Sequence, residues 1–254
     1  MNKLLLLFLL LACPPLLLAQ DIDPVSSGST AAPGKADAKD QEEELFIFDE
    51  DEILVVSDPL EPVNRGIFWF NDKLYFYLLK PLARGYRWLA PEPIRIGVQN
   101  FFSNLATPIR LVNSGLQLKF VDAGNELTRF AVNSTLGIGG LFDPAKEHFN
   151  IRKKDEDTGQ TLGHYGLGPG IYIVLPALGP SNIRDGIGLL ADSYMDLTRY
   201  AWENRDYYGA KTFDVINDLS IDKDTYEGIT KDALDPYLFI RDAYMQYRQN
   251  KVEN

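Results

Sequence analysis

The sequence predicts an all-α fold, and three observations lead to this prediction. Apolar residues recur every three or four positions in most segments after residue 58, which is the spacing of one helix face. Prolines interrupt this pattern at Pro81, Pro91 and Pro108, so the helices are expected to be short. The pairs Asp58-Pro59 and Asp235-Pro236 each combine a capping side chain with a proline suited to a first helical turn.

The composition limits the classes of function. A chain of 254 residues can form one domain with a sizeable core or two small ones. Its formal net charge of −11 disfavours binding to phosphate backbones, so we expect no nucleic acid partner. The only cysteine, Cys13, lies in the N-terminal leader. The mature chain is therefore expected to have no internal disulfide and no thiol-ligated metal.

The leader reads as a secretory signal peptide. A short basic start is followed by a leucine-rich run that ends at Ala12 and is too short to span a bilayer, which takes about 20 residues. Two cleavage sites remain open. If Leu10 to Cys13 is a lipobox, residues 1–12 are removed and Cys13 is lipidated; otherwise cleavage follows Ala19 and residues 1–19 are removed. In both cases the chain is exported.

The exported chain is predicted to begin with a linker and to lack a membrane-spanning helix. Residues 20–57 are rich in acidic and small residues, which predicts an acidic flexible linker. No later segment has about 18 consecutive apolar residues, so membrane contact would come from helices that lie in the interface.

The first helix is expected to start at Asp58 and to be apolar on nearly every face from Ile67 to Leu79. Such a helix is either buried in a large core or faces lipid, and the aromatic residues favour lipid. The predicted membrane-facing side chains are Phe68, Trp69, Tyr75 and Phe76. The polar triplet 71–73 should point toward water, a partner or an inner cavity, because charge in hydrocarbon is costly.

Further helices are expected downstream: 94–105, 109–120, one capped by Asp122, one that begins near Arg184, and a last one from Asp235. Two segments, 136–144 and 161–170, combine glycines with large apolar residues, which suits backbone that packs closely or acts as a hinge. Residues 248–254 are expected to form a polar, fraying tail.

The search for catalytic residues finds none that we favour. His164 next to Asp185 or Asp192 could act as a general base, but a structural histidine is the preferred interpretation. The glycines at 163, 166, 168 and 170 lack the lysine of a phosphate-binding loop. The acidic clusters do not have calcium-loop spacing. The sequence therefore predicts no enzyme, no metal and no cofactor.

Several motifs in the right order resemble the MlaA family, also called VacJ. They begin with Asp-Pro-Leu-Glu-Pro-Val-Asn-Arg at 58–65 and include 81–83, 100–108, 126–143, 161–168, Pro176, Arg184-Asp185 and 235–237. The resemblance covers about Asp58 to Tyr247 and implies one MlaA-like helical domain at 58–247.

The resemblance implies a ring-like assembly in the periplasmic leaflet of the outer membrane, with a Gly-rich hairpin loop and a central amphipathic channel. It implies an intermembrane phospholipid transport component that removes mislocalised phospholipids from the outer leaflet. The phospholipids would pass to a periplasmic carrier protein of the Mla system, which maintains lipid asymmetry, and the protein would associate with a trimeric porin. An alternative is a porin-associated structural scaffold without lipid transfer, and a third is a periplasmic lipid hydrolase that uses His164.

Site residues follow from the resemblance by position. Gly166 and Gly168, next to Tyr165, match the glycine pair of the channel-lining hairpin loop, where they would permit flexing. Asn71 and Asp72 match the place where the first long helix adjoins the channel. The charged Asp72-Lys73 pair departs from the family pattern there.

Overall fold

A computed structural model describes residues 56–222, 224–231 and 233–253 of the protein. The leader, the candidate lipidation site Cys13 and nearly all of the predicted linker 20–57 lie outside the described residues. Within them helices dominate, so the all-α prediction is confirmed. The elements in chain order are α2 (Glu61–Leu74), η1 (Tyr75–Leu79), α3 (Lys80–Leu89), α4 (Glu92–Leu105), α5 (Thr107–Leu116), α6 (Phe120–Thr135), α7 (Pro144–Glu147), α8 (Thr158–His164), β1 (Tyr172–Leu175), β2 (Gly179–Asn182), α9 (Ile183–Met195), α10 (Thr198–Ala201), α11 (Asn204–Ile221), α12 (Thr225–Lys231) and α13 (Pro236–Glu253).

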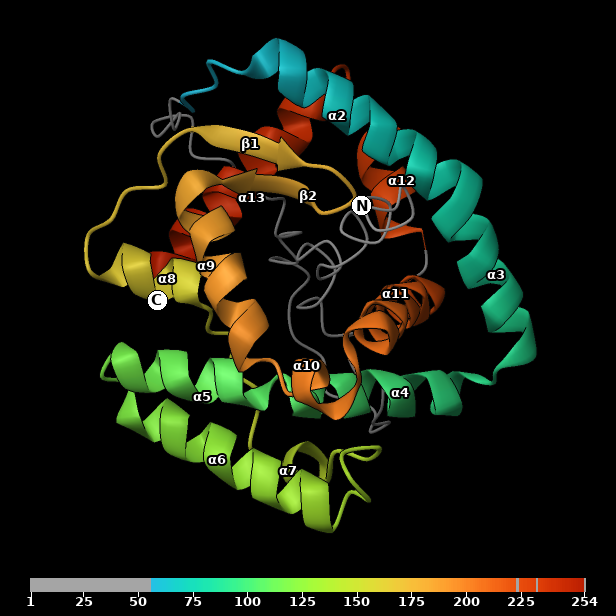
Figure 1. The fold of residues 1–254 in the computed structure, drawn as a ribbon, viewed down its shortest axis with the longest axis vertical. Helices are drawn as coiled ribbons and strands as arrows, with labels where there is room; N and C mark the ends of the chain where they lie inside the picture. The colour runs from blue at the N-terminus through green and yellow to red at the C-terminus, as the bar shows by residue number, and fades with distance from the viewer. Residues whose placement is uncertain (1–55, 223, 232, 254) are drawn as a thin grey trace, which may run out of the picture.

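The helices follow a three-cornered outline (Figure 1). One side is the continuous run α2–η1–α3, a second is α4 with α5, and the third holds α8, α9, the β1–β2 hairpin and α13. Helix α6 packs on α5, and α11 packs on both α3 and α4. The channel that the family resemblance implies stays a prediction.

The first side is one long helical run because a π-helical turn precedes Pro81. The sequence predicts a break there, but the chain stays helical from Glu61 to Leu89. A proline inside an α-helix clashes with the carbonyl four residues earlier. The wider turn of η1 lies directly before this proline, where it relieves that clash.

The helix starts agree only in part with the predicted caps. Asp235 performs as predicted, since its Oδ1 accepts hydrogen bonds from the amides of Tyr237 (3.1 Å) and Leu238 (3.3 Å). Asp58 does not cap α2, which begins at Glu61; its carboxylate instead accepts from Asn64 Nδ2 at 2.8 Å and from the Tyr237 hydroxyl. Asp122 lies in the first turn of α6 and not before it.

The prediction of a polar tail from 248 is wrong for the described residues. Helix α13 continues to Glu253, and its buried stripe is Tyr237, Ile240, Tyr244 and Arg248. Arg248 is only 3% exposed. A charged side chain is stable there because it is fully paired with two carboxylates, which the sequence pattern does not reveal.

The β1–β2 hairpin is the one sheet of the described residues. Its strands are antiparallel, with Tyr172 opposite Asn182 and Leu175 opposite Gly179. Tyr172 and Val174 of β1 form the main buried apolar cluster with Tyr237 and Tyr244 of α13. The hairpin is therefore fixed between α2 and α13, directly after the glycine-rich segment.

Candidate functional site

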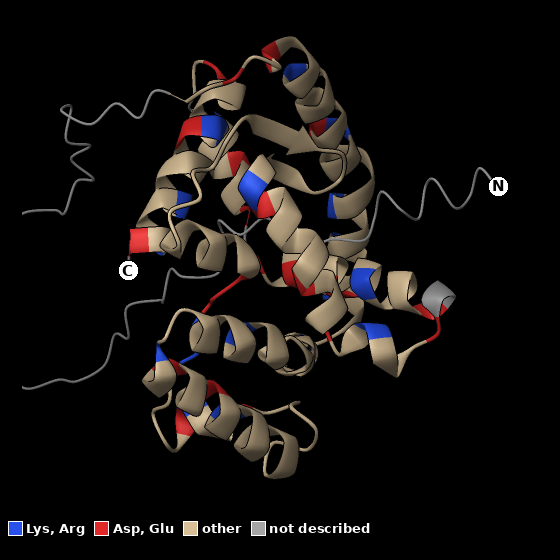
Figure 2. Cartoon of the chain, turned by 60° about the vertical axis from the view of Figure 1, so that its left-hand side comes forward, with Lys and Arg blue, Asp and Glu red and all other residues tan. Residues whose placement is uncertain are grey.

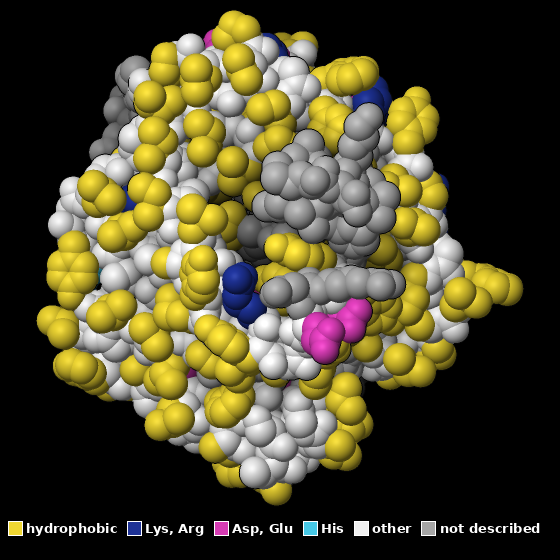
Figure 3. Space-filling view, viewed as in Figure 1, with side chains coloured by type: hydrophobic (Ala, Val, Ile, Leu, Met, Phe, Trp, Pro, Cys, Tyr) yellow, Lys and Arg dark blue, Asp and Glu magenta, His cyan; other side chains and the backbone are white. Residues whose placement is uncertain are grey.

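Polar side chains fill much of the interior, and apolar side chains cover much of the outside. Apart from Tyr172, the largest fully buried side chains are all polar: Glu126, Asn64, Asn113, Asn182, Asn217, Thr107, Thr198, Ser114 and Ser220. Outside, Trp88 is 85% exposed, and Val121 is 78% exposed. Figure 3 shows hydrophobic side chains spread over much of one face. Exposed apolar surface of this extent indicates a protein or membrane partner.

Helix α9 shows the same inversion on one element. Ile187, Leu190 and Tyr194 recur at helical spacing along α9, yet all three are exposed. The face that packs inward carries Arg184, Asp185 and Gly188. In a water-facing helix the two faces would be exchanged. Figure 2 shows that the other helices also carry short charged clusters between long stretches without Lys, Arg, Asp or Glu.

The four predicted membrane-facing side chains divide into two pairs. Trp69 and Phe76 are exposed, at 62% and 38%. Phe68 instead packs edge-on against Tyr237, with ring centroids 5.7 Å apart. Tyr75 packs on Tyr226 at 4.7 Å, and its hydroxyl donates to Glu227 at 3.0 Å. A helix that is apolar on all faces gives no signal for which face turns inward, so the sequence could not separate the pairs.

Asn71 holds the tip of the hairpin against α2. Its Nδ2 donates to the carbonyl of Leu175 at 2.9 Å, and its Oδ1 accepts from the amide of Ala177 at 2.7 Å. Asn64, two helical turns earlier, binds β1 in the same way through Tyr172 and Val174. Both asparagines therefore supply the backbone partners that a third strand would supply.

Asp72 points toward α12. Its Oδ1 accepts from the Tyr226 hydroxyl at 3.2 Å, and its Oδ2 pairs with Lys73 at 3.0 Å. Burial first, and then Asp72, raise the pKa of Tyr226 above its usual range. The polar triplet 71–73 thus contacts neighbouring elements of the protein, and the structure does not bring Asn71 or Asp72 into hydrogen bonding with Gly166 or Gly168.

The predicted hinge residues lie in the segment 165–171 between α8 and β1, which we call the glycine loop. Gly166 has φ +86°, a left-handed conformation, and its amide donates to Gly163 O at 2.8 Å at the end of α8. A Cβ at Gly166 or at Gly168 would meet nothing within 4 Å. Tyr165 is exposed, and its hydroxyl donates to the carbonyl of Leu116 on α5.

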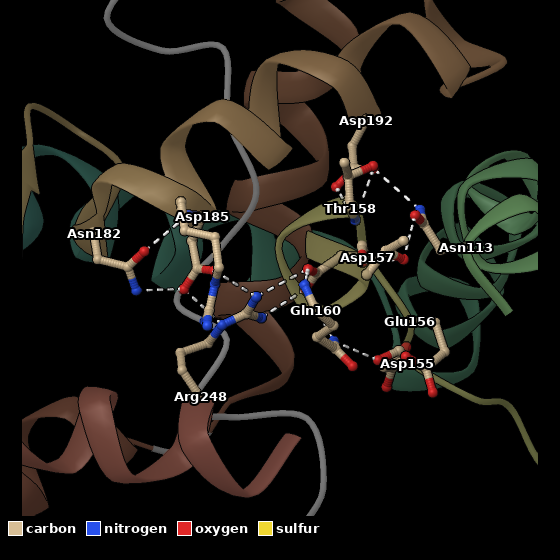
Figure 4. A network of polar contacts seen from close by, with 12 residues as sticks. Asn113, Asp155, Glu156, Asp157, Thr158, Gln160, Asn182, Asp185, Asp192 and Arg248 are labelled. Atoms are coloured by element: carbon tan, nitrogen blue, oxygen red, sulfur yellow. Dashed lines mark hydrogen bonds and ion pairs between the residues drawn. The ribbon is translucent and has the colours of Figure 1, made fainter. Parts of the chain in front are cut away.

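A buried ionic cluster lies at the base of the glycine loop (Figure 4). Arg248 of α13 donates from Nε to Asp185 Oδ2 at 2.8 Å and from Nη1 to Asp157 Oδ2 at 2.6 Å. Its Nη2 donates to the second oxygen of each carboxylate, at 3.0 and 2.9 Å. We call these three residues the Arg248 clamp. Of these three residues, only Asp185 belongs to a matched sequence motif, Arg184-Asp185.

The charges of the clamp stabilise one another. Burial alone would raise the pKa of Asp185 and Asp157, but Arg248 holds both below the ordinary value of a carboxyl group. Asp185 also accepts from Asn182, Arg184 and Tyr244. Both carboxylates therefore stay ionised and bound across the neutral pH range.

His164 is not placed for catalysis with either candidate carboxylate. It is exposed at the end of α8, whereas Asp185 belongs to the Arg248 clamp. Asp192 accepts from the Thr158 hydroxyl at 2.6 Å and from Asn113 at 3.3 Å, and burial raises its pKa to about 6. Among the described residues no group of three or more His, Cys, Asp or Glu could hold a metal ion.

A second set of buried acids lies on α11. Burial and mutual repulsion raise the pKa of Asp214 to about 7, and burial raises that of Asp218 to about 6. Lys211 pairs with Asp196 at 2.6 Å and lies 3.9 Å from Asp214, while Gln99 donates to Asp218 at 3.2 Å.

In the part of the chain that the structure describes, no helix has the length and apolarity needed to cross a membrane.

Known proteins resemble the chain over the whole described region. Residues 56–251 match the model of the family described as MlaA lipoprotein. A protein of Rickettsia prowazekii is 36% identical over 231 residues, which cover 87% of this chain and 89% of the relative. The "Intermembrane phospholipid transport system lipoprotein MlaA" of Escherichia coli K12 is 37% identical over 194 residues, or 75% of this chain and 76% of the relative.

A solved structure has the same fold. It comes from work described as "Structural basis for maintenance of bacterial outer membrane lipid asymmetry". The match has a TM-score of 0.66 and 33% sequence identity, and covers 77% of this chain and 99% of that chain.

Proposed function

The chain belongs to the MlaA lipoprotein family, and from this we propose that it removes mislocalised phospholipids from the outer leaflet of the outer membrane and passes them to a periplasmic carrier. It is a component of intermembrane phospholipid transport and serves outer-membrane lipid asymmetry. The chemistry is non-covalent, so the protein needs no catalytic residue and no cofactor.

The inverted distribution of polar and apolar side chains is the observation that carries the proposal. A phospholipid has a charged head and long apolar tails. A body with apolar side chains such as Trp88 and Val121 on the outside suits the tails, because this surface would sit among acyl chains. Inside, buried polar groups such as Glu126 and Asn113 have hydrogen-bond partners within the protein, so they hold the helices together without a large apolar core.

The glycine loop is proposed as the moving part at this site, with Gly166 as its flexing point. The structural support is that the loop is open around Gly166 and Gly168, while the segments on both sides are tightly bound. Asn71 holds the hairpin tip on α2, and the Arg248 clamp holds the base. Motion would therefore be confined to the loop.

The working location and partners follow from the same proposal. The protein works in the cell envelope, and we propose the periplasmic side of the outer membrane, with Trp69 and Phe76 among the lipid-contacting residues. A trimeric porin and a soluble lipid carrier of the Mla system are the proposed protein partners.

Lipid analysis of the native protein tests the proposal. The chain is extracted from outer membranes in mild detergent, with a photo-crosslinking amino acid at Gly168 and, as control, a second version with the crosslinker at the exposed charged residue Glu147. We expect phospholipid adducts at Gly168 and a deletion strain that accumulates outer-leaflet phospholipid and becomes detergent-sensitive. A porin-bound protein without phospholipid, together with normal outer-leaflet lipid in the deletion strain, would support the scaffold alternative instead.

A test for hydrolysis is separate from the transport test. Purified protein is incubated with phospholipid vesicles, and released fatty acid is measured. We expect none above that of a His164→Ala control. Fatty acid release that disappears in His164→Ala would replace the transport proposal with the hydrolase alternative.

A further inference from the structure

Arg248 connects helices α8 and α9, which precede and follow the glycine loop and the hairpin in the chain. Helix α8 ends directly before the loop, and α9 begins directly after β2. Asp157 is the N-cap residue of α8, where its Oδ1 accepts from the amide of Gln160 at 2.8 Å. Asp185 lies in the first turn of α9. The guanidinium therefore binds the start of α8 and the start of α9 at the same time.

The geometry requires arginine and not merely a positive charge. Three nitrogens of Arg248 donate four hydrogen bonds of 2.6–3.0 Å to two carboxylates. A planar guanidinium can present donors in two directions at once, whereas a lysine ammonium is a single point charge. Tyr244, one turn earlier on α13, donates to Asp185 at 2.8 Å and supports the same arrangement.

The helices around the clamp leave little room for adjustment. A Cβ at Gly159 would lie 2.5 Å from Asp185 Oδ1 and 2.8 Å from Arg248 Nη2. A Cβ at Gly163 would lie 2.7 Å from Cγ2 of Val252 on α13. Because α8 is in close backbone contact with its neighbours, any shift of α8 would break bonds of the clamp.

We propose that Arg248 is the positioning residue of the glycine loop. By fixing α8 and α9 relative to each other, it sets the distance and direction between the two ends of the segment 165–182. The loop then flexes about Gly166 while α8 and α9, at the two ends of the segment, stay in place. This inference rests on the proposed function for its relevance to lipid transfer, but the structural coupling stands independently of it.

Spin labels measure the coupling directly. The exported chain is made with a leader that lacks cysteine, so that Leu167→Cys carries the only label, in the loop. In a second version, Val121→Cys carries a reference label in the first turn of α6. Each is combined with Arg248→Met, with Arg248→Lys, and with Arg241→Met. Arg241 lies two turns earlier on α13 and pairs with Asp242 and Asp58, so it is a matched control.

The expected result is a shift to narrower, more mobile line shapes at position 167 in Arg248→Met, and a smaller shift in Arg248→Lys. Spectra at position 121 should not change, and Arg241→Met should change neither position even if it lowers the melting temperature. Unchanged spectra at 167 in a folded Arg248 variant overturn the proposal. If Arg248→Met does not fold, Arg248→Lys and Tyr244→Phe carry the test.

The lipid readout separates this inference from the proposed function. Cells with Arg248→Met should lose detergent resistance, and cells with Arg241→Met should keep it. A mobile loop with full resistance overturns the role of Arg248 in transfer but not the lipid function itself. Normal outer-leaflet lipid in the deletion strain would refute the proposed function. The spectra at position 167 would still test whether Arg248 positions the glycine loop.

Discussion

Gly166 and Gly168 lie close together in the glycine loop, yet their backbones have different requirements. Gly166 has φ +86°, which L side chains rarely adopt, whereas Gly168 is not in this region. Neither has a neighbour that would clash with a Cβ. Conformation and not space therefore decides what a substitution does at each position.

We expect Gly166→Ala to lower stability by roughly 1–2 kcal/mol, the cost of a left-handed L residue, and Gly168→Ala to be near neutral. In a domain of this size that is a fall in Tm of about 2–8 °C. Thermal unfolding in detergent measures both variants. Equal effects of the two substitutions would contradict the assignment, and detergent resistance of the cells shows whether the stiffer loop also impairs transfer.

Asn71 uses both ends of its amide, and this gives a second residue-level prediction. In Asn71→Asp a carboxylate oxygen would face the carbonyl of Leu175, so the donated hydrogen bond is replaced by repulsion. We expect a loss of about 1–3 kcal/mol in the free energy of unfolding, as for an unsatisfied buried polar group. Asn100→Asp is the control, because its bond to Leu141 O is long at 3.5 Å and should cost little.

At the scale of one element, α9 depends on a backbone contact with α8. A Cβ at Gly188 would lie 2.4 Å from the amide nitrogen of Gly159, a distance that no rotamer can relieve. A Cβ at Gly186, half a turn earlier, would meet the Cδ1 of Ile173 at 3.7 Å and the Oγ of Ser181 at 3.9 Å, which are ordinary contacts. The same helix thus offers one glycine that is required and one that is not.

We expect Gly188→Ala to destabilise the protein by about 1–3 kcal/mol through overpacking. Gly186→Ala should stabilise it by roughly 0.5–1 kcal/mol, because alanine is the better helix former. Chemical or thermal unfolding of the two variants side by side gives the sign of each. A stabilising Gly188→Ala would show that α8 and α9 do not pack as closely as described.

Helix α11 is expected to make stability depend on pH. The pKa of Asp214 is raised from 3.8 to about 7, so the folded state binds more protons than the unfolded state between about pH 4 and pH 7. Stability from this group therefore falls as pH rises through that range. Lys211 lies 3.9 Å from Asp214 and lowers its pKa, whereas the charges of Asp218 and Asp196 raise it.

Asp214→Asn removes the buried charge, so we expect it to raise stability at pH 8 by roughly 2 kcal/mol and to have little effect near pH 4. Thermal melts of the parent and variant at pH 4.5, 6 and 8 test this. Asp206→Asn, on the exposed part of the same helix, is the control and should shift the melting temperature equally at all three pH values. A pH-independent gain in Asp214→Asn would contradict the raised pKa.

Much of each element, but not its orientation, could be predicted from the sequence. The apolar spacing in α9 and α13 and the Asp235-Pro236 start were readable, because they depend on local geometry. Which face of α2 or α9 turns inward was not, because an exposed apolar stripe has the same period as a buried one. Arg248 was missed for a different reason: its two carboxylate partners, Asp185 and Asp157, are remote in sequence.

At the scale of the whole molecule, the exposed apolar surface should suffice for membrane attachment. Trp88 and Leu89 at the end of α3 and Val121 at the start of α6 are all more than two-thirds exposed. Burying each large apolar side chain gains about 1.5–3 kcal/mol, so about five of them match a single acyl chain, which gains about 0.8 kcal/mol for each buried CH2 group. Lipidation at Cys13 would then add to attachment and not create it.

We therefore expect a chain exported with a cysteine-free leader to stay in the membrane fraction after a high-salt wash and to need detergent for extraction. Fractionation followed by immunoblotting measures this, with a soluble periplasmic protein as the control. Release of the cysteine-free chain by salt alone would show that attachment depends on a lipid anchor or on charge.

The ends of the outline in Figure 1 meet through contacts between residues far apart in the sequence. Arg65 of α2 pairs with Asp235 at 2.8 Å, and Asn64 binds Tyr172. Helix α2 docks on the hairpin, α12 and α13, all of which come at least 90 residues later in the chain. Folding rates fall as contacting residues become more distant in sequence, because a long loop must close first. During export the aromatic face of α2 would thus wait exposed in water, and a chaperone that shields apolar helices should speed its folding.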